Sequence, residues 1–248
     1  MSNFTVFDTE TTSLEKPYCY NIGYQIFNEN FDCLLRREYV VEQIWHNLPL
    51  FSTAYYAEKR PLYVSAMRAK KAVLEKFGNI CQQMIRDFKA FEVETAYAYN
   101  SEFDEKVFNF NCDWFKVINP FDNIQILDIR GNAHQFICGK DFKRFCEENE
   151  LFTEKGNYST TADTVGKFIV GLDFNEEHTA LADTDIEARI LQETVSLGAE
   201  LGKACDTFHS IPRITKKEVI VKQNKQVVFT ATAEKIKWYP SKNTLYLD

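Results

Sequence analysis

Residues 3–12 read NFTVFDTETT, a mostly apolar β run that ends in two acids. Side chains alternate along a strand, so Asp8 and Glu10 share one face and lie about 7 Å apart at about 3.3 Å per residue. Two carboxylates this close at the end of a buried strand repel each other unless a positive charge lies between them. A divalent metal ion is the simplest such charge. The alternative is a strand that runs into solvent through an acidic turn, and this stretch alone favours neither.

The composition bounds the class of protein. The 248 residues are 45% hydrophobic and 15% aromatic, which is enough apolar material for one large domain, or for one domain with an appendage. No run of about 18 apolar residues predicts a membrane span, and the opening residues do not read as a signal peptide. We therefore expect a cytoplasmic protein with no membrane partner. The seven cysteines are scattered without a C-x-x-C pair, which favours reduced thiols over disulfides or a zinc site.

The formal net charge of −7 is unevenly distributed. Residues 211–248 hold eight Lys/Arg and three Asp/Glu, a net charge of +5, which leaves −12 on the rest of the chain. Such asymmetry indicates that the tail has a partner of its own. A basic segment suits a nucleic acid as this partner. Another protein, such as a polymerase, or a second copy of the chain is the alternative.

The tail also reads as a separate β module. Its sequence predicts a hairpin of residues 218–222 and 227–232, followed by strands at 235–239 and 244–247. A module this short cannot bury a core of its own. We therefore divide the chain into a main domain, residues 1–205, and a basic, β-rich C-terminal extension, residues 206–248.

The order of strands and helices in the main domain predicts its fold. Three successive strands, residues 3–12, 20–27 and 34–41, suggest an antiparallel meander. Strand and helix then alternate, with helices at 63–90 (broken near Gly78), 101–114, 141–150, 161–170 and 179–197, and strands at 93–99 and 124–127. The alternation predicts an α/β fold, a mixed sheet flanked by helices.

Two of these helices carry an acid near the start of an apolar stripe. The stripes are Phe103, Val107, Phe110 and Trp114 in one helix, and Asp183, Ile186, Ile190 and Leu197 in the other. Acids in a first turn are favoured by the helix dipole. Asp104 also fits a capping box with Ser101 as the N-cap residue. Each acid therefore has an ordinary structural explanation when taken alone.

Residues 43–61, the aromatic segment, interleave rings with cations. They include Trp45, Phe51, Tyr55, Tyr56, Lys59 and Arg60. Interleaved rings and cations suit a groove in which the bases of a single strand stack on aromatic faces. A segment packed over the core is the commoner arrangement and is the interpretation favoured here.

Three short motifs stand in order along the main domain: FDTETT at 7–12, NSEFD at 100–104 and HTALAD at 178–183. Together they resemble the three exonuclease motifs of the DEDD superfamily, which includes the proofreading subunit of bacterial DNA polymerase III and RNase T. A histidine five residues before the last Asp is the mark of the histidine branch, DEDDh. The resemblance covers about residues 1–201 and implies a ribonuclease H-like fold and a two-metal 3′→5′ exonuclease.

The resemblance also implies roles for five residues. Asp8, Glu10, Asp104 and Asp183 would bind two Mg²⁺ or Mn²⁺ ions, hard cations that favour oxygen ligands. His178 would accept the proton of the attacking water, a task to which its ordinary pKa of about 6.5 is suited.

Contacts with the terminal nucleotide are implied for four further residues: Thr11, Leu14, Asn100 and Phe103. Two positions depart from the pattern, because Ser13 stands where many relatives have Gly and Tyr99 where several have His. Both changes bear on sugar or base preference, so DNA and RNA remain open as substrates.

We therefore expect a metal-dependent exonuclease that releases nucleoside 5′-monophosphates from the 3′ end of single-stranded DNA, in preference to RNA. One alternative is an exoribonuclease that trims RNA ends by the same chemistry. Another is a nuclease-fold protein that acts additionally as a binding module through its C-terminal β extension.

Overall fold

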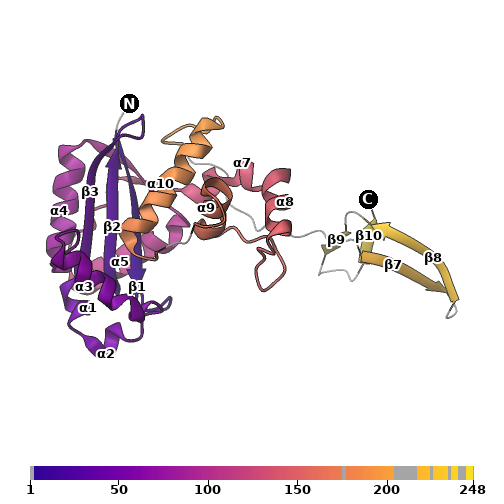
Figure 1. Ribbon diagram of the computed structural model, residues 1–248, viewed down its shortest axis with the longest axis horizontal. Helices are drawn as coiled ribbons and strands as arrows, with labels where there is room; N and C mark the ends of the chain where they lie inside the picture. The colour runs from indigo at the N-terminus through magenta and orange to yellow at the C-terminus, as the bar shows by residue number, and fades with distance from the viewer. Residues whose placement is uncertain are drawn as a thin grey trace.

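The computed structural model describes residues 3–174 and 177–203, and the backbone of four strands at 217–223, 226–233, 236–239 and 244–247. Its centre is a six-stranded sheet in the order β4-β3-β2-β1-β5-β6 (Figure 1). The strands β1 (Asn3–Thr11), β2 (Cys19–Phe27) and β3 (Cys33–Val41) form the predicted antiparallel meander. The shorter β4 (Val73–Glu75), β5 (Val93–Ala98) and β6 (Gln125–Asp128) pair in parallel with β3, β1 and β5 respectively. The predicted mixed α/β sheet is confirmed.

Helices cover both faces of this sheet. On one face, α4 (Phe77–Ala90) and α5 (Ser101–Phe115) pack on a cluster of buried residues that includes Phe7 and Tyr24. On the other face, α9 (Ala162–Val170) and α10 (Ala180–Ser196) pack on a second cluster that includes Val6. Val6 and Phe7 are neighbours in β1, and because side chains alternate along a strand they point to opposite faces of the sheet and belong to different clusters.

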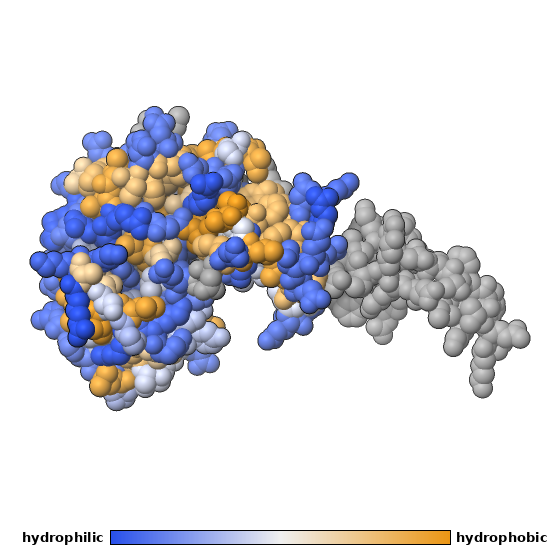
Figure 2. All heavy atoms as spheres, in the orientation of Figure 1, coloured by the Kyte–Doolittle hydropathy of each residue, from blue (hydrophilic) through white to orange (hydrophobic). Residues whose placement is uncertain are grey.

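Shorter helices complete the domain. They are α1 (Glu42–Trp45), α2 (Leu48–Phe51), the 3₁₀ helix η1 (Ala57–Lys59), α3 (Arg60–Arg68), α6 (Ile129–Asn132), α7 (His134–Ile137) and α8 (Lys140–Glu148). None of the helices that the structure describes has the length and apolar character needed to cross a bilayer. On the face shown in Figure 2, hydrophobic residues form patches that are interrupted by hydrophilic ones.

Polar side chains of β2 hold the first turn of α10. Asn21 and Gln25 lie on the same face of β2, and both are buried. The Asn21 Oδ1 accepts a hydrogen bond from the backbone N–H of Ala180 at 2.7 Å, and the Gln25 Nε2 donates to the Thr184 Oγ1 at 2.8 Å. A buried amide that finds such partners fixes one geometry, because leaving it unpaired would cost about 1–3 kcal/mol. The start of α10 is thereby placed relative to β2.

Gly23, which lies between these two amides, lets the helix come close. A Cβ atom on Gly23 would lie 2.2 Å from the backbone nitrogen of Leu181, and no side-chain rotation could relieve this clash because the contacted atom belongs to the backbone. Gly23 also pairs with Asp8 of β1 in the sheet. The close approach at Gly23 therefore sets how near α10 comes to the acidic end of β1.

One predicted helix is two helices in the structure. The region 63–90 contains α3 and α4, and they are separated by β4 rather than by a break at Gly78. Val73 and Leu74 pair with Tyr39 and Val40 of β3. The positions of these two apolar residues fit a helical period, but the residues belong to a strand at the edge of the sheet.

The buried faces of two helices also differ from the prediction. The buried residues of α5 are Asp104, Val107, Phe108, Asn111 and Cys112, so of the predicted stripe only Val107 belongs to the buried face. Trp114 is 59% exposed and packs edge-on against Tyr18 instead. In α10 the prediction is right for Asp183, Ile186 and Ile190, whereas Leu197 lies beyond the helix and is exposed.

The strands predicted for the C-terminal extension are present. β7 (Lys217–Gln223) pairs antiparallel with β8 (Gln226–Ala233), and β9 (Ile236–Tyr239) pairs antiparallel with β10 (Thr244–Leu247). The boundary expected at residue 205 falls outside the described residues.

The contact at Gly23 predicts a large cost for a single methyl group. Gly23→Ala should lower the free energy of unfolding by about 1–3 kcal/mol or more, the usual range for overpacking, because backbone must move to admit the Cβ. The midpoint of urea unfolding, followed by circular dichroism, measures this. Gly78→Ala is the matched control: its Cβ would meet only a side-chain methyl of Val117 at 3.0 Å, so we expect little loss. A Gly23→Ala protein as stable as the wild type would contradict the contact.

Candidate active site

The two acids of β1 face α10. Asp8 and Glu10 pair in register with Gly23 and Asn21, the β2 residues that dock this helix. Glu10 also accepts a hydrogen bond from the Tyr20 hydroxyl at 3.5 Å. β1 therefore presents both carboxylates at its carboxyl end, on the side from which α10 arrives.

Asp104 approaches the same end of β1 from α5. β5 runs parallel to β1, so the turn that follows β5 brings the first turn of α5 beside the acids of β1. Asp104 is 2% exposed, and its Oδ1 accepts a hydrogen bond from the Thr9 hydroxyl at 2.6 Å. The N-cap of α5 is Asn100, in a left-handed conformation with φ of 65°. Ser101 is therefore not the N-cap, and the capping-box interpretation of Asp104 is wrong.

Asp183 and His178 come from the start of α10 and the loop before it. Asp183 is 6% exposed, and its Oδ1 accepts a hydrogen bond from the backbone N–H of His178 at 3.1 Å. Potential ligand atoms of Glu10, His178 and Asp183 all lie within 4.8 Å of one another. Segments that are far apart in the sequence thus meet at one point, and an ion held by the carboxylates there would lie close to the imidazole.

The electrostatics of this cluster favour a bound cation. The pKa of Asp8 is raised well above its ordinary value, first by burial and then by the carboxylates of Asp104, Glu187, Asp183 and Glu10. Burial also raises the pKa of Asp104 to about 7, although the hydrogen bond from Thr9 opposes the shift. Carboxylates that crowd together in this way are stabilised by a divalent ion among them. A donor set of carboxylate oxygens fits Mg²⁺ or Mn²⁺.

The sequence analysis missed two residues of this site. Glu187 is 3% exposed and follows Asp183 by one helical turn, so its spacing placed it on the same face of α10. Tyr56 of the aromatic segment stacks on the His178 ring, with the centroids 4.4 Å apart and the planes 12° from parallel. No spacing rule connects Tyr56 with His178, because the contact depends on the tertiary fold alone.

The residues expected to hold the terminal nucleotide surround the carboxyl ends of β1 and β5. Thr11 ends β1, and Leu14 in the next loop is 73% exposed, with its carbonyl accepting from Lys106 at 3.0 Å. The backbone N–H of Asn100 donates to the Asp128 carboxylate at 2.8 Å. Phe103 is half-buried and packs on the cluster beneath α4 and α5. Leu14 is thus open to a ligand, whereas Phe103 is partly occupied by the core.

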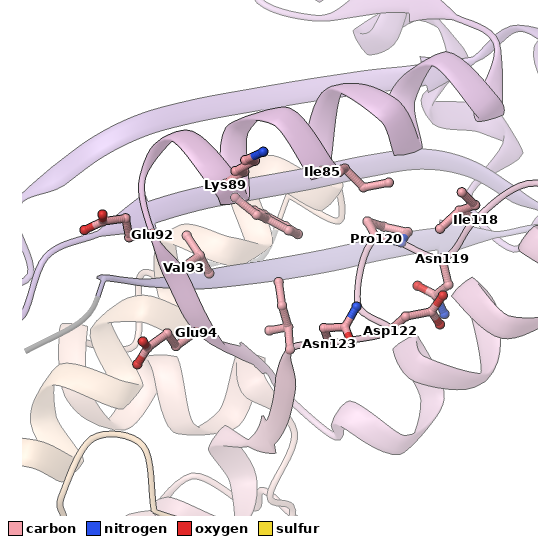
Figure 3. A pocket seen from close by; sticks show the side chains of 12 residues that line it. Ile85, Lys89, Glu92, Val93, Glu94, Ile118, Asn119, Pro120, Asp122 and Asn123 are labelled. Carbon is pink, nitrogen blue, oxygen red and sulfur yellow. The ribbon is translucent and has the colours of Figure 1, made fainter.

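A hollow in the surface lies away from these residues. Lys89, Glu92 and Val93 line it together with the loop at 118–124 (Figure 3). Val93 begins β5, whereas Asp104 follows the end of that strand. The hollow is therefore at the opposite end of β5 from the acidic cluster.

Comparisons with known proteins bear on the fold. The structure resembles a 3′-exonuclease that recognises the 3′ end of a histone mRNA stem-loop, with 13% identity, a TM-score of 0.56, and coverage of 85% of this chain and 74% of the other. The structure also resembles a full-length 3′-exonuclease, with 14% identity, a TM-score of 0.55, and coverage of 85% of this chain and 68% of the other. The sheet flanked by helices is thus the ribonuclease H-like fold of these exonucleases, as the sequence predicted.

A third solved structure is E. coli Exonuclease I bound to a dA16 oligonucleotide, with 17% identity and a TM-score of 0.45 over 78% of this chain. The chain spans about 41% of the length of that protein. No family model matches the sequence, and no curated protein matches it either.

The raised pKa of Asp104 predicts how the metal-free protein responds to pH. A carboxyl group with a higher pKa in the folded state destabilises that state as pH rises from about 4, where the unfolded chain ionises, to about 7. Asp104→Asn removes this charge and keeps an oxygen that accepts from Thr9. In chelator at pH 7.5 its Tm should exceed that of the wild type by about 2–4 °C for each kcal/mol gained, and at pH 4 the difference should vanish.

Thermal unfolding with and without divalent ions checks this prediction. Mg²⁺ or Mn²⁺ should raise the Tm of the wild type more than that of Asp104→Asn, because a ligand that binds only the folded state stabilises it. A variant less stable than the wild type in chelator at pH 7.5 would contradict the raised pKa of Asp104.

Proposed function

We propose that the chain is a metal-dependent 3′→5′ exonuclease of the histidine branch of the DEDD superfamily, which releases nucleoside 5′-monophosphates from single-stranded DNA. The observation that carries the proposal is the convergence of Glu10, His178 and Asp183 within 4.8 Å beside Asp8 and Asp104. The fold shared with 3′-exonucleases supports it. A cluster of buried acids beside one histidine is also costly for a structure to maintain unless it serves chemistry.

In this proposal Asp8, Glu10, Asp104 and Asp183 hold two Mg²⁺ or Mn²⁺ ions. When bound, such ions lower the pKa of water and offset the charge that develops on the departing oxygen. The chain itself supplies the geometry: β1 fixes two of the ligands, α5 the third and α10 the fourth. The hydrogen bond from the Thr9 hydroxyl to Asp104 joins β1 to α5. The hydrogen bond from the Ala180 backbone to Asn21 joins α10 to β2 of the same sheet.

His178 is the general base. It accepts a proton from the attacking water, whose oxygen forms the new bond to phosphorus while the bond to the 3′ oxygen of the preceding nucleotide breaks. That oxygen leaves with a proton from solvent, and the terminal nucleotide departs as a 5′-monophosphate. The pKa of His178 is lowered by burial and then by the nearby Lys59 charge, with Asp163 opposing. The imidazole is therefore neutral, and able to accept a proton, at neutral pH.

The second candidate function is RNA trimming by the same chemistry. The resemblance to a 3′-exonuclease that recognises a histone mRNA stem-loop favours it. The two candidates share every residue of the proposed site, so only the sugar and base contacts separate them. Leu14, which is 73% exposed beside β1, is the natural place to look for such contacts.

One assay tests the proposed function and the choice of sugar together. Single-stranded DNA and RNA of matched sequence, each labelled at the 3′ or the 5′ end, are incubated with Mg²⁺, with Mn²⁺ and with chelator. We expect immediate release of the 3′ label as a mononucleotide and a descending ladder from the 5′-labelled strand. Asp8→Ala and Asp183→Ala should abolish both. Cleavage in chelator, or full activity in either variant, would exclude the proposed centre.

The same assay, run at single turnover with saturating metal, examines His178. His178→Ala should lower the rate by about 10²–10⁴, the usual contribution of general-base catalysis. The wild-type rate should rise with pH to a plateau, with its midpoint below 6.5 because the pKa of His178 is lowered. This rise of the rate with pH should be absent from His178→Ala. If it persists in that variant, the titration belongs to another group.

We also propose that residues 206–248 form a unit distinct from the exonuclease domain, residues 1–205, and bind the strand upstream of its 3′ end. The net charge of +5 on residues 211–248 supports this role, because the acidic body repels phosphate. The lysines concerned are Lys216, Lys217, Lys222, Lys225, Lys235 and Lys237. A polymerase or a second copy of the chain is the competing partner.

Deleting residues 211–248 distinguishes these partners. Each neutralised phosphate adds about 0.7 to the salt dependence of single-strand binding, so the truncated chain should bind long strands more weakly and with a flatter salt dependence. Hydrolysis of a dinucleotide should barely change. If sedimentation shows a smaller assembly while the salt dependence stays the same, the tail is a self-association surface and does not bind the strand.

A further inference from the structure

The backbone of His178 does not by itself fix the direction of the imidazole. His178 lies in the loop before α10 with a left-handed φ of 52°, a conformation that a non-glycine residue rarely adopts. Its backbone N–H is held by Asp183 at 3.1 Å. The side chain still has two rotatable bonds, so another part of the fold must select the rotamer that points toward Glu10 and Asp183.

The aromatic segment supplies that contact. The Tyr56 ring lies flat against the His178 ring, with centroids 4.4 Å apart and an interplanar angle of 12°. The Lys59 ammonium lies 4.6 Å from the centroid of the same Tyr56 ring. Lys59 also donates a hydrogen bond to the backbone carbonyl of Glu177, the residue before His178. One short turn therefore holds both the ring of His178 and the backbone that leads to it.

This turn is itself anchored to the core. The guanidinium of Arg60 lies 3.8 Å from the centroid of the Trp45 ring and 4.9 Å from that of Phe51, and its Nη1 donates to the Trp45 carbonyl at 3.1 Å. Trp45 and Phe51 are 6% and 2% exposed. Tyr55, by contrast, is 84% exposed. The aromatic segment is thus packed over the core, as the sequence favoured, and Tyr56 extends this packing to the histidine.

We propose that Tyr56 is a positioning residue for His178, with Lys59 fastening the loop that carries it. The proposal rests on the proposed exonuclease function, in which His178 is the general base. Tyr56 selects the rotamer in which the imidazole lies within 4.8 Å of ligand atoms of Glu10 and Asp183, before any substrate arrives. Ring pairs of this kind have effects that correspond to about a 2- to 10-fold change in an equilibrium. The productive rotamer should therefore lose about that much of its population when the Tyr56 ring is removed.

The stack can be observed without any catalysis. In the metal-free protein, the ring protons of His178 should resonate upfield of those of the other histidines, because they lie above the face of Tyr56. His178→Ala identifies the resonance by its loss. Tyr56→Ala should return the resonance to its ordinary position, whereas Tyr56→Phe, which keeps the ring, should leave it shifted. Tyr55→Ala is the control: it removes an exposed ring that packs edge-on against Tyr56 but does not stack on His178, and it should also leave the resonance shifted.

Kinetics then separate positioning from binding. On a dinucleotide, at saturating metal and at the pH plateau, Tyr56→Ala should lower kcat by about 2- to 10-fold and leave KM unchanged, and Tyr56→Phe should restore kcat. Lys59→Met, which keeps the Tyr56 ring but releases Glu177, should lower kcat in the same direction and provides a second variant if Tyr56→Ala folds poorly. A raised KM with unchanged kcat would make Tyr56 a substrate contact and overturn the positioning role.

Failure of this inference differs from failure of the proposed function. A resonance that is unshifted in an active wild-type enzyme would overturn the role of Tyr56 alone. A wild-type protein that shows the shifted resonance but hydrolyses no strand would overturn the exonuclease function, and with it the part that Tyr56 plays in catalysis.

Discussion

The contact between the backbone of Gly23 and the first turn of α10 is the constraint on which the site depends. A helix usually packs on a sheet through side chains, but here the helix backbone lies directly against the strand because residue 23 has no side chain. The amides of Asn21 and Gln25, on either side, receive the helix and fix its rotation. Asp183 and Glu187 are then brought into the range of Asp8, with which Gly23 is paired. If α10 were held at the ordinary spacing, Asp183 would lie farther from the acids of β1.

This proximity works against stability in the absence of metal. Burial and neighbouring negative charge both raise the pKa of Asp8, so the folded state is penalised for each ionised carboxylate that it gathers. Two hydrophobic clusters, one on each face of the sheet, offset that penalty. The arrangement is typical of functional sites, where a locally unfavourable geometry is maintained by the packing around it.

Much of this could be predicted from the sequence. The meander, the mixed sheet and the acidic start of α10 followed from alternation and helical spacing, because these patterns are local. The rest depended on long-range contacts. The spacing of Val73 and Leu74 predicted a helix, but in the structure they pair with β3 as an edge strand. The spacing of Trp114 predicted a buried side chain, but it packs against Tyr18 at the surface. Gly23 gave no signal within β2, since its role is visible only once Leu181 is beside it. Tyr56 could be placed in an aromatic segment, but its partner His178 could not be inferred from spacing.

The order in which the acids occur along the chain has a consequence for synthesis. Asp8, Glu10 and Asp104 belong to the early and middle parts of the domain, whereas His178, in the loop before α10, and Asp183 and Glu187, within α10, are synthesised later. A chain that ends before α10 has the six strands of the sheet, but it lacks the α10 residues of the second hydrophobic cluster and the carboxylates of Asp183 and Glu187. The docking of α10 adds the charges of Asp183 and Glu187 to the repulsion that Asp104 and Glu10 already exert on Asp8, and the same event completes the candidate site. A partly made chain that ends before residue 178 therefore has neither the full charge repulsion nor the complete candidate site.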